Sequence, residues 1–120
     1  MADFDSTVKA LRKWTRGHDP HVRAAVELLV WHEAWLRRAD FTRACVFRDD
    51  DGAAWIGWIE AREFASSGRA RASTSETAVL ELAVAIGSNQ YKLSHMGDAH
   101  AKAIVKAFAD ALGAEVPGRG

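Results

Sequence analysis

The sequence of 120 residues has one cysteine, two prolines and no formal net charge, since sixteen basic residues balance sixteen acidic ones. The single cysteine, Cys45, excludes an intramolecular disulfide. The zero charge leaves no overall field to attract nucleic acid or an anionic membrane, so such binding would need a local patch. The longest apolar stretch, residues 78–86, contains Glu81 and is far shorter than the roughly 20 residues of a membrane helix.

The first residues also lack the basic and apolar regions of a secretory signal. Together with the single cysteine, this favours a cytoplasmic location. The composition, 48% hydrophobic and 27% charged, is that of a packed globular protein. We therefore expect a single globular domain over residues 1–120, with a frayed tail at about 115–120.

Apolar residues recur at helical spacing through most of the chain, and the predicted helices have clear boundaries. Gly17 suits the end of the first helix, while Asp19 and Pro20 suit the cap and first position of the second. Ser73 and Glu76 have the spacing of a capping box, and Gly113 suits the end of the last helix. The predicted helices are residues 5–16, 20–38, 60–67, from the Ser73 cap to about 86, and 97–112.

Residues 42–48 and 53–59 are rich in Val, Ile, Phe and Trp, and they flank three aspartates followed by Gly52. Asp-Gly between two such segments is typical of a tight turn joining antiparallel strands. We expect Cys45 to be an inert, partly buried thiol in the first strand. The predicted fold is α+β, with about five helices packed around one antiparallel two-stranded hairpin.

Tryptophans are numerous for this length, and their large rigid rings are favoured both in cores and at protein interfaces. In a strand over 53–59, Trp55 and Trp58 would lie on opposite faces, so one would stay available to a partner. The strand edges carry no protecting proline or lysine. We expect binding to another protein or to the chain's own copy, as a homodimer. The candidate interaction residues are Trp31, Trp35, Trp55 and Trp58.

Local groups of basic residues offer a second hypothesis, a nucleic-acid-associated accessory protein, although no recognised binding motif accompanies them. Their cations could hold phosphates, but a solvated helix face explains the same pattern. The residues of this candidate patch are Arg12, Lys13, Arg16, Arg37, Arg38, Arg69 and Arg71.

A third hypothesis is a hydrolase-like enzyme around His95, Asp98 and His100. Catalytic groups are usually assembled from distant segments, so local clustering is weak support. Capping of the last helix by Ser94 or Asp98 explains the same residues without chemistry.

His32 lies in the middle of the wide apolar arc of the second helix. We expect a buried polar residue there, since burial disfavours the charged imidazole. No pair or trio of Cys and His has the spacing of metal ligands, so we expect no metal and no cofactor. With no assembled catalytic motif, the sequence favours a small non-enzymatic protein-interaction or regulatory module over the other two hypotheses.

Overall fold

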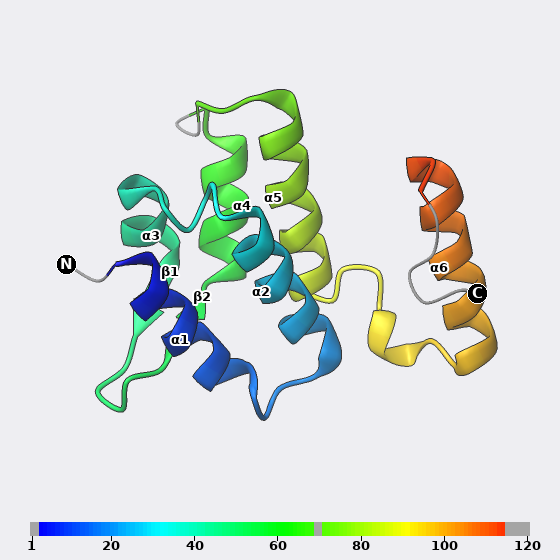
Figure 1. Cartoon of the computed structure of the whole chain (residues 1–120), viewed down its shortest axis with the longest axis horizontal. Coiled ribbons are helices and arrows are strands. Elements are labelled where there is room, and N and C mark those ends of the chain that lie inside the picture. Colours follow the sequence, from blue (N-terminus) through cyan, green and yellow to red (C-terminus); the bar gives the residue numbers. More distant parts are fainter. Residues whose placement is uncertain (1–2, 69–70, 115–120) are drawn as a thin grey trace.

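The computed structural model of the chain describes residues 3–68 and 71–114. In that part, helices pack around a two-stranded antiparallel sheet, which confirms the predicted α+β class (Figure 1). The predicted tail at about 115–120 and Arg69 of the basic patch lie outside the described residues. The elements are α1 Phe4–Thr15, α2 Pro20–His32, α3 Ala39–Cys45, β1 Val46–Arg48, β2 Ala54–Ile56, α4 Trp58–Ser66, α5 Thr74–Gly87, the 3₁₀ helix η1 Leu93–His95, and α6 Asp98–Leu112.

Two predicted helix boundaries are confirmed by their hydrogen bonds. The Ser73 hydroxyl accepts from the Glu76 backbone N–H at 3.1 Å, and the Glu76 carboxylate accepts from the Ser73 N–H at 2.9 Å. This capping box satisfies two amides at the start of α5, and the hydrogen bonds from Ser73 lower the pKa of Glu76. Gly113 ends α6 in the left-handed conformation, with φ of 69°.

The prediction that the second helix continues to residue 38 is wrong, because α2 ends at His32. Glu33 takes a φ of 66°, and its N–H still donates to the Leu29 carbonyl at 2.9 Å. This left-handed residue turns the chain out of the helix. The turn carries Trp35 and Leu36 into the core, where both are buried.

The strand predicted over 42–48 is mostly helix, since α3 continues to Cys45 and β1 contains three residues. The Asp40 carboxylate accepts from the Phe41 N–H at 2.8 Å, and a negative charge is favoured at a helix start. Phe41 and Cys45, four residues apart, are fully buried on the same helix face. Cys45 therefore ends a helix and is more deeply buried than expected.

The predicted hairpin turn is confirmed. Phe47 pairs with Trp55 at the centre of the antiparallel ladder, and Gly52 takes a φ of 86°. The Asp49 carboxylate accepts from the Asp51 and Ala53 backbone N–H groups, which fixes the loop.

The second strand is shorter than the predicted 53–59, because β2 ends at Ile56 and α4 begins at Trp58. The Gly57 N–H donates to the Cys45 carbonyl at 2.9 Å, so this residue joins the end of α3. Its own carbonyl accepts from the Ala61 N–H at 2.8 Å, which starts the helix. Trp58 therefore belongs to a helix, and the alternation of a strand does not apply to it.

Three aromatic side chains from separate segments form the centre of the core. The Trp35, Phe41 and Phe64 ring centroids are 5.5 to 6.1 Å apart, in tilted or edge-to-face pairs. The Trp35 Nε1–H donates to the Glu76 carbonyl at 2.9 Å, so its polar atom is satisfied. Each such ring contributes about 2–3 kcal/mol by burial. The cluster joins α3, α4 and the turn after α2 into one body.

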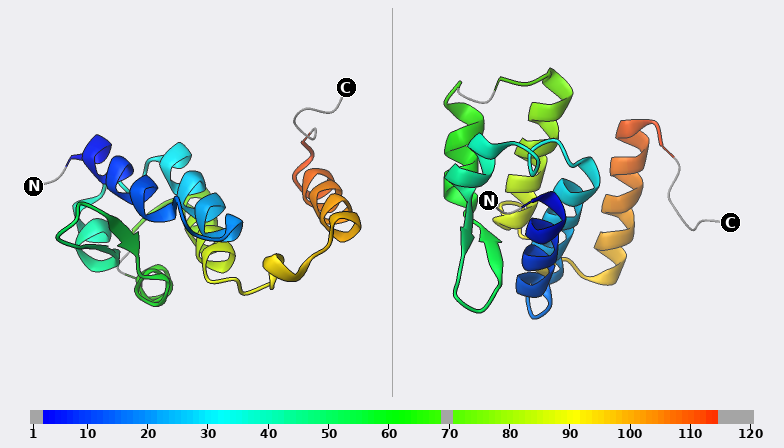
Figure 2. Two further views of the ribbon diagram at one scale, coloured as in Figure 1. Left: turned by 90° about the horizontal axis from the view of Figure 1, so that it is seen from below. Right: turned by 60° about the vertical axis from the view of Figure 1, so that its left-hand side comes forward.

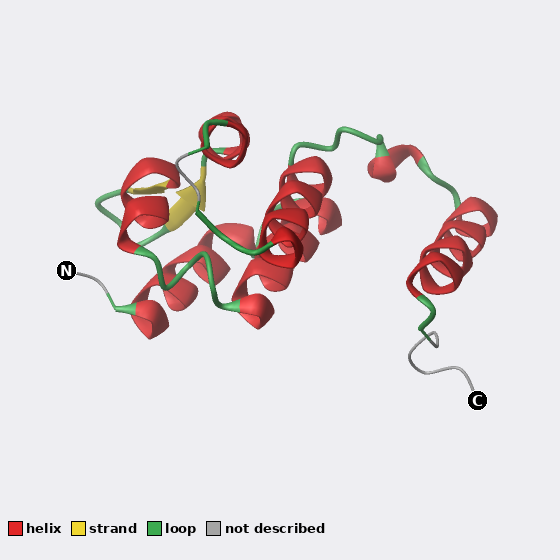
Figure 3. Ribbon diagram, turned by 90° about the horizontal axis from the view of Figure 1, so that it is seen from above, coloured by secondary structure: helices red, strands yellow, loops and turns green. Residues whose placement is uncertain are grey.

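The helix α6 stands apart from the body formed by the preceding elements, as the views in Figure 2 and Figure 3 agree. The chain reaches it through Ser88–Gly97, which includes η1. In the part of the chain that the structure describes, no helix has the length and apolar character needed to span a membrane.

Candidate interaction surface

The four candidate tryptophans have different environments. Trp35 is 1% exposed and belongs to the core. Trp31, one helical turn earlier, is 79% exposed on α2. Of the two, only Trp31 can be offered to a partner without unfolding the body.

Trp55 and Trp58 are both half-buried by their own chain. The Trp55 ring stacks on Phe47, its partner across the ladder, with centroids 6.0 Å apart. The Trp58 ring packs against Gly87 at the end of α5, where a side chain would not fit. Much of each ring therefore has a partner within the chain, and an interface at the hairpin stays an untested prediction.

The strongest unexplained surface is the apolar side of α6. All residues of α6 are described, and none is buried. Val105, Phe108 and Leu112 are 51%, 49% and 76% exposed. With Ala101 and Ile104 they fall within a third of the helix circumference, while Lys102 and Lys106 occupy the other side.

A second exposed apolar surface lies where α2 and α5 pack side by side in opposite directions. The His21 ring, at the start of α2, contacts the Ile86 carbonyl at 3.2 Å, while Trp35 bonds to Glu76 at the other end of α5. Along both helices, apolar residues at helical spacing face outward. We call this surface the α2–α5 face, which consists of Pro20, Ala24, Leu28 and Trp31 on α2 with Val79, Leu82 and Ile86 on α5.

The α2–α5 face deepens toward η1 into a hollow of about 570 Å³. Its apolar lining comes from α2, the end of α5 and the connection to α6. Ala24, Ile86, Leu93 and Met96 line the apolar part of this hollow. A bulky aliphatic or aromatic side chain could enter it.

The residues of the basic patch are largely engaged within the chain. Arg12 donates to both Glu27 carboxylate oxygens at 2.8 and 2.9 Å, and this hydrogen bonding lowers the pKa of Glu27. Arg37 forms an ion pair with Glu33 at 2.7 Å. The bidentate Arg12–Glu27 pair and the Arg37–Glu33 pair in the turn after α2 neutralise these cations locally.

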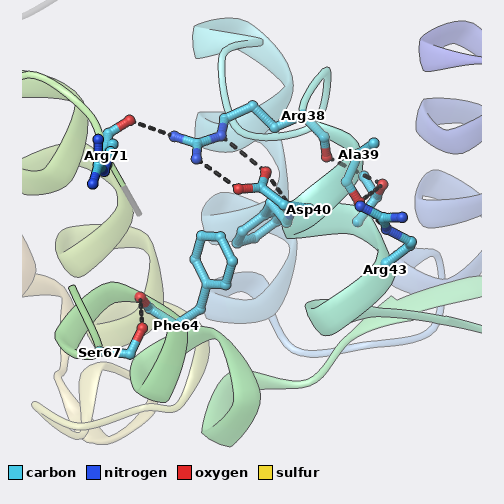
Figure 4. A network of polar contacts seen from close by, with 9 residues as sticks. Arg38, Ala39, Asp40, Arg43, Phe64, Ser67 and Arg71 are labelled. Carbon is cyan, nitrogen blue, oxygen red and sulfur yellow. Dashed lines mark hydrogen bonds and ion pairs between the residues drawn. The ribbon is translucent and has the colours of Figure 1, made fainter. Parts of the chain in front are cut away.

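Arg38 forms the most extensive of these contacts (Figure 4). It donates to both Asp40 carboxylate oxygens, at 3.0 and 2.7 Å, and to the Arg71 carbonyl at 2.9 Å. Its guanidinium also lies 4.9 Å from the Trp35 ring centroid. The hydrogen bond from Arg38 holds the pKa of Asp40 below its ordinary value. This arginine therefore fixes the turn after α2 to the loop before α5.

Two further basic residues lie on α1. Lys13 donates to the Asp51 carbonyl of the hairpin loop, and Arg16 is exposed at the end of the helix. They are separated along the chain from the Arg38 network. Within the described residues, the basic groups are thus joined to several different elements.

The candidate hydrolytic residues lie in η1 and at the start of α6. His95 in η1, and Asp98 and His100 in α6, are all exposed. No side chain caps α6, because its N-cap is Gly97, and Ser94 instead accepts from Asn89 at 2.9 Å. The expected cap by Ser94 or Asp98 is therefore wrong.

The hollow beside η1 does hold a serine, a histidine and an aspartate, namely Ser94, His21 and Asp19. The His21 Nδ1 contacts the Ile86 carbonyl at 3.2 Å, and its Nε2 lies 3.6 Å from the Asp19 carboxylate. Both ring nitrogens face acceptors other than the serine, so this arrangement lacks a base for Ser94.

His32 is only partly buried, whereas we expected a buried residue. The early end of α2 explains the difference, since the ring lies in its last turn. Its Nδ1 atom is buried and has no hydrogen-bond partner among the described residues. In the same part of the chain, no three His, Cys, Asp or Glu side chains are placed to bind one metal ion.

Comparisons of this chain with protein-family models, curated proteins and solved structures find no match. The α6 surface has a sequence signal, the regular amphipathic pattern of residues 97–112, from which the sequence alone predicts only a helix.

Proposed function

We propose that this chain is a small non-enzymatic interaction module, which binds another protein or its own copy through apolar helical surfaces. The observation that carries the proposal is the exposed apolar side of α6, where Phe108 is 49% exposed and Leu112 is 76% exposed. Isolated helices of this length are marginally stable in water, so a packed partner would stabilise α6.

The two apolar surfaces also suit a known mode of recognition, in which an amphipathic helix lays its apolar side into a groove. Ala101, Ile104, Phe108 and Leu112 provide anchors at the usual helical intervals. The α2–α5 face supplies a shallow surface with a hollow at one end. The module thus offers both a helix and a receptor surface.

The ion pairs of the arginines reduce support for a nucleic-acid function, since Arg12, Arg37 and Arg38 already face carboxylates. The exposed positions of His95 and His100 similarly reduce support for hydrolysis. The interaction module is the hypothesis that uses the most prominent unexplained feature of the fold.

The test is photo-crosslinking in cells that produce the full chain. A photoreactive phenylalanine analogue replaces Phe108 in one variant and Ala103, on the polar side of the same helix, in the control. We expect crosslinked products from position 108 and few from position 103. Equal products from both positions, or none, would contradict a specific interaction through α6. The mass of the product identifies the partner as a second copy or a different protein.

A further inference from the structure

We infer that the partner is a second copy of this chain, and that two copies exchange their α6 helices, each packing on the α2–α5 face of the other. This inference rests on the proposed function. It also moves the expected homodimer interface from the hairpin to the C-terminal helix.

The first argument is the amount of surface that the chain exposes. The accessible surface is 7993 Å², whereas a compact monomer of this mass exposes about 6,400 Å². The radius of gyration is 15.0 Å, compared with about 13.6 Å for a compact domain of this length. Both whole-chain values exceed those of a compact monomer, and within the described residues no residue of α6 is buried.

The second argument is the area available for association. Exchange covers the exposed apolar side chains of α6 and of the α2–α5 face twice in one pair, and this doubling brings the contact toward the roughly 1,600 Å² of a stable specific interface. Trp31 is the largest exposed side chain of that face, and buried tryptophans often dominate binding energy.

The third argument concerns the connection that precedes α6, which is anchored to its own body. The Ser88 hydroxyl donates to the Val84 carbonyl at 2.7 Å, and the Gln90 N–H donates to the Ala85 carbonyl at 3.0 Å. Beyond them, Leu93 and Met96 line the hollow next to α2. Packing of α6 on a second copy requires no change in these contacts.

Two chains related by a twofold axis form a closed pair in which every contact is made twice. Each chain carries one exposed helix and one complementary face, so a twofold axis satisfies both surfaces of both chains at once. The contact is then made twice, and the second occurs within an already formed pair at high effective concentration. A different protein would have to supply both a groove for α6 and a helix for the α2–α5 face.

The experiment is size exclusion coupled to light scattering, with the full chain at tens of micromolar. We expect a mass twice the 13.1 kDa of one chain. The variant Phe108→Lys should have the mass of one chain, while Ala103→Lys, which adds the same charge to the polar side of α6, should remain a dimer. Leu82→Glu on the α2–α5 face should also give one chain. Circular dichroism checks that each variant is folded, as expected from the exposure of Phe108 and Ala103.

Mixing the two disrupted variants tests whether the exchange is reciprocal. A mixed pair of Phe108→Lys and Leu82→Glu has one unmodified contact, whereas each variant alone has both contacts modified. We therefore expect the mixture to regain dimer mass. An inference of self-exchange is overturned if the unmodified chain has the mass of one chain, if Phe108→Lys leaves the dimer intact, or if the mixture stays monomeric. If photo-crosslinking at position 108 then captures a different protein, the proposed function stands and only the second copy is refuted.

Discussion

Substitution of Gly87 by alanine provides a sharp test of the packing between α4 and α5. Gly87 is buried at the end of α5, and a Cβ there would lie 2.6 Å from Cη2 of Trp58 and closer still to Cζ2 and Cε2. Carbon atoms in contact are normally about 3.5–4 Å apart, so the indole ring would have to move by about 1 Å.

The magnitude follows from two opposing effects. Overpacking of this kind costs about 1–3 kcal/mol. Replacing glycine by alanine inside a helix stabilises the fold by at most about 1 kcal/mol, and by less at the last residue of the helix. Gly87 has no positive φ, so backbone strain adds nothing. We expect Gly87→Ala to lower the free energy of unfolding by about 1–2 kcal/mol, the difference between these effects.

Urea unfolding measures this loss: the urea concentration at the midpoint of unfolding should be lower, while the slope m stays the same. Gly17→Ala is the matched control, because a Cβ there meets no atom within 4 Å, and its stability should not fall. In a Trp58→Ala background the clash is absent, so Gly87→Ala should become neutral or stabilising. An unchanged midpoint for Gly87→Ala, or an equal loss with and without the Trp58 ring, would refute this account of the α4–α5 contact.

Three further outcomes are expected from the described contacts. Ser73→Ala removes the acceptor for the Glu76 N–H and should cost about 1 kcal/mol in urea unfolding, and an unchanged midpoint would contradict the capping box. Hydrogen bonds from Arg12 and Ser73 lower the pKa of Glu27 and Glu76 from 4.5 in the folded chain, so their stabilisation is complete above about pH 4.5 and lost as the pH falls through the folded values. The melting temperature should therefore drop on acidification, and Glu27→Gln should show a smaller drop than the unmodified chain. EDTA should leave the melting temperature unchanged, whereas a fall that zinc reverses would reveal a required metal.

The boundaries that depend on local chemistry could be predicted from the sequence. Ser73 and Glu76 satisfy each other's backbone groups without help from the rest of the fold, so their spacing was sufficient. Gly52 and Gly113 take positive φ values that glycine tolerates best, and both turns were expected for that reason. Such signals are reliable because the interactions involve only neighbouring residues.

The secondary structure around Cys45 was harder to predict, because the residues of this segment suit a helix and a strand almost equally. Short apolar segments carry too few repeats to separate a period of 3.6 from a period of 2. The helix is selected by Asp40 at its start and by burial of Phe41 and Cys45 against other elements. That burial depends on the aromatic cluster with Trp35 and Phe64, which forms only in the complete fold.

The tryptophans show how the backbone conformation of one residue can decide which side chains are exposed. In a continuous helix, Trp31 and Trp35 would lie on the same side, one turn apart, and would share one environment. The left-handed Glu33 breaks this relationship and sends Trp35 into the core, while Trp31 stays in water. A non-glycine residue with positive φ is uncommon, so helical periodicity alone gives no warning of it.

The exposed α6 illustrates a more general limit. Its amphipathic pattern indicates that Ile104, Phe108 and Leu112 need an apolar partner, but periodicity is the same whether that partner belongs to the same chain or to another. The homodimer interface expected from the sequence lies at the hairpin and its tryptophans, and residues 97–112 have no role in it. The connection before α6 is held at its start, where Ser88 donates to the Val84 carbonyl and Asn89 donates to Ser94. The spacing of apolar residues therefore identifies which side of α6 needs a partner, but it does not encode which chain supplies that partner.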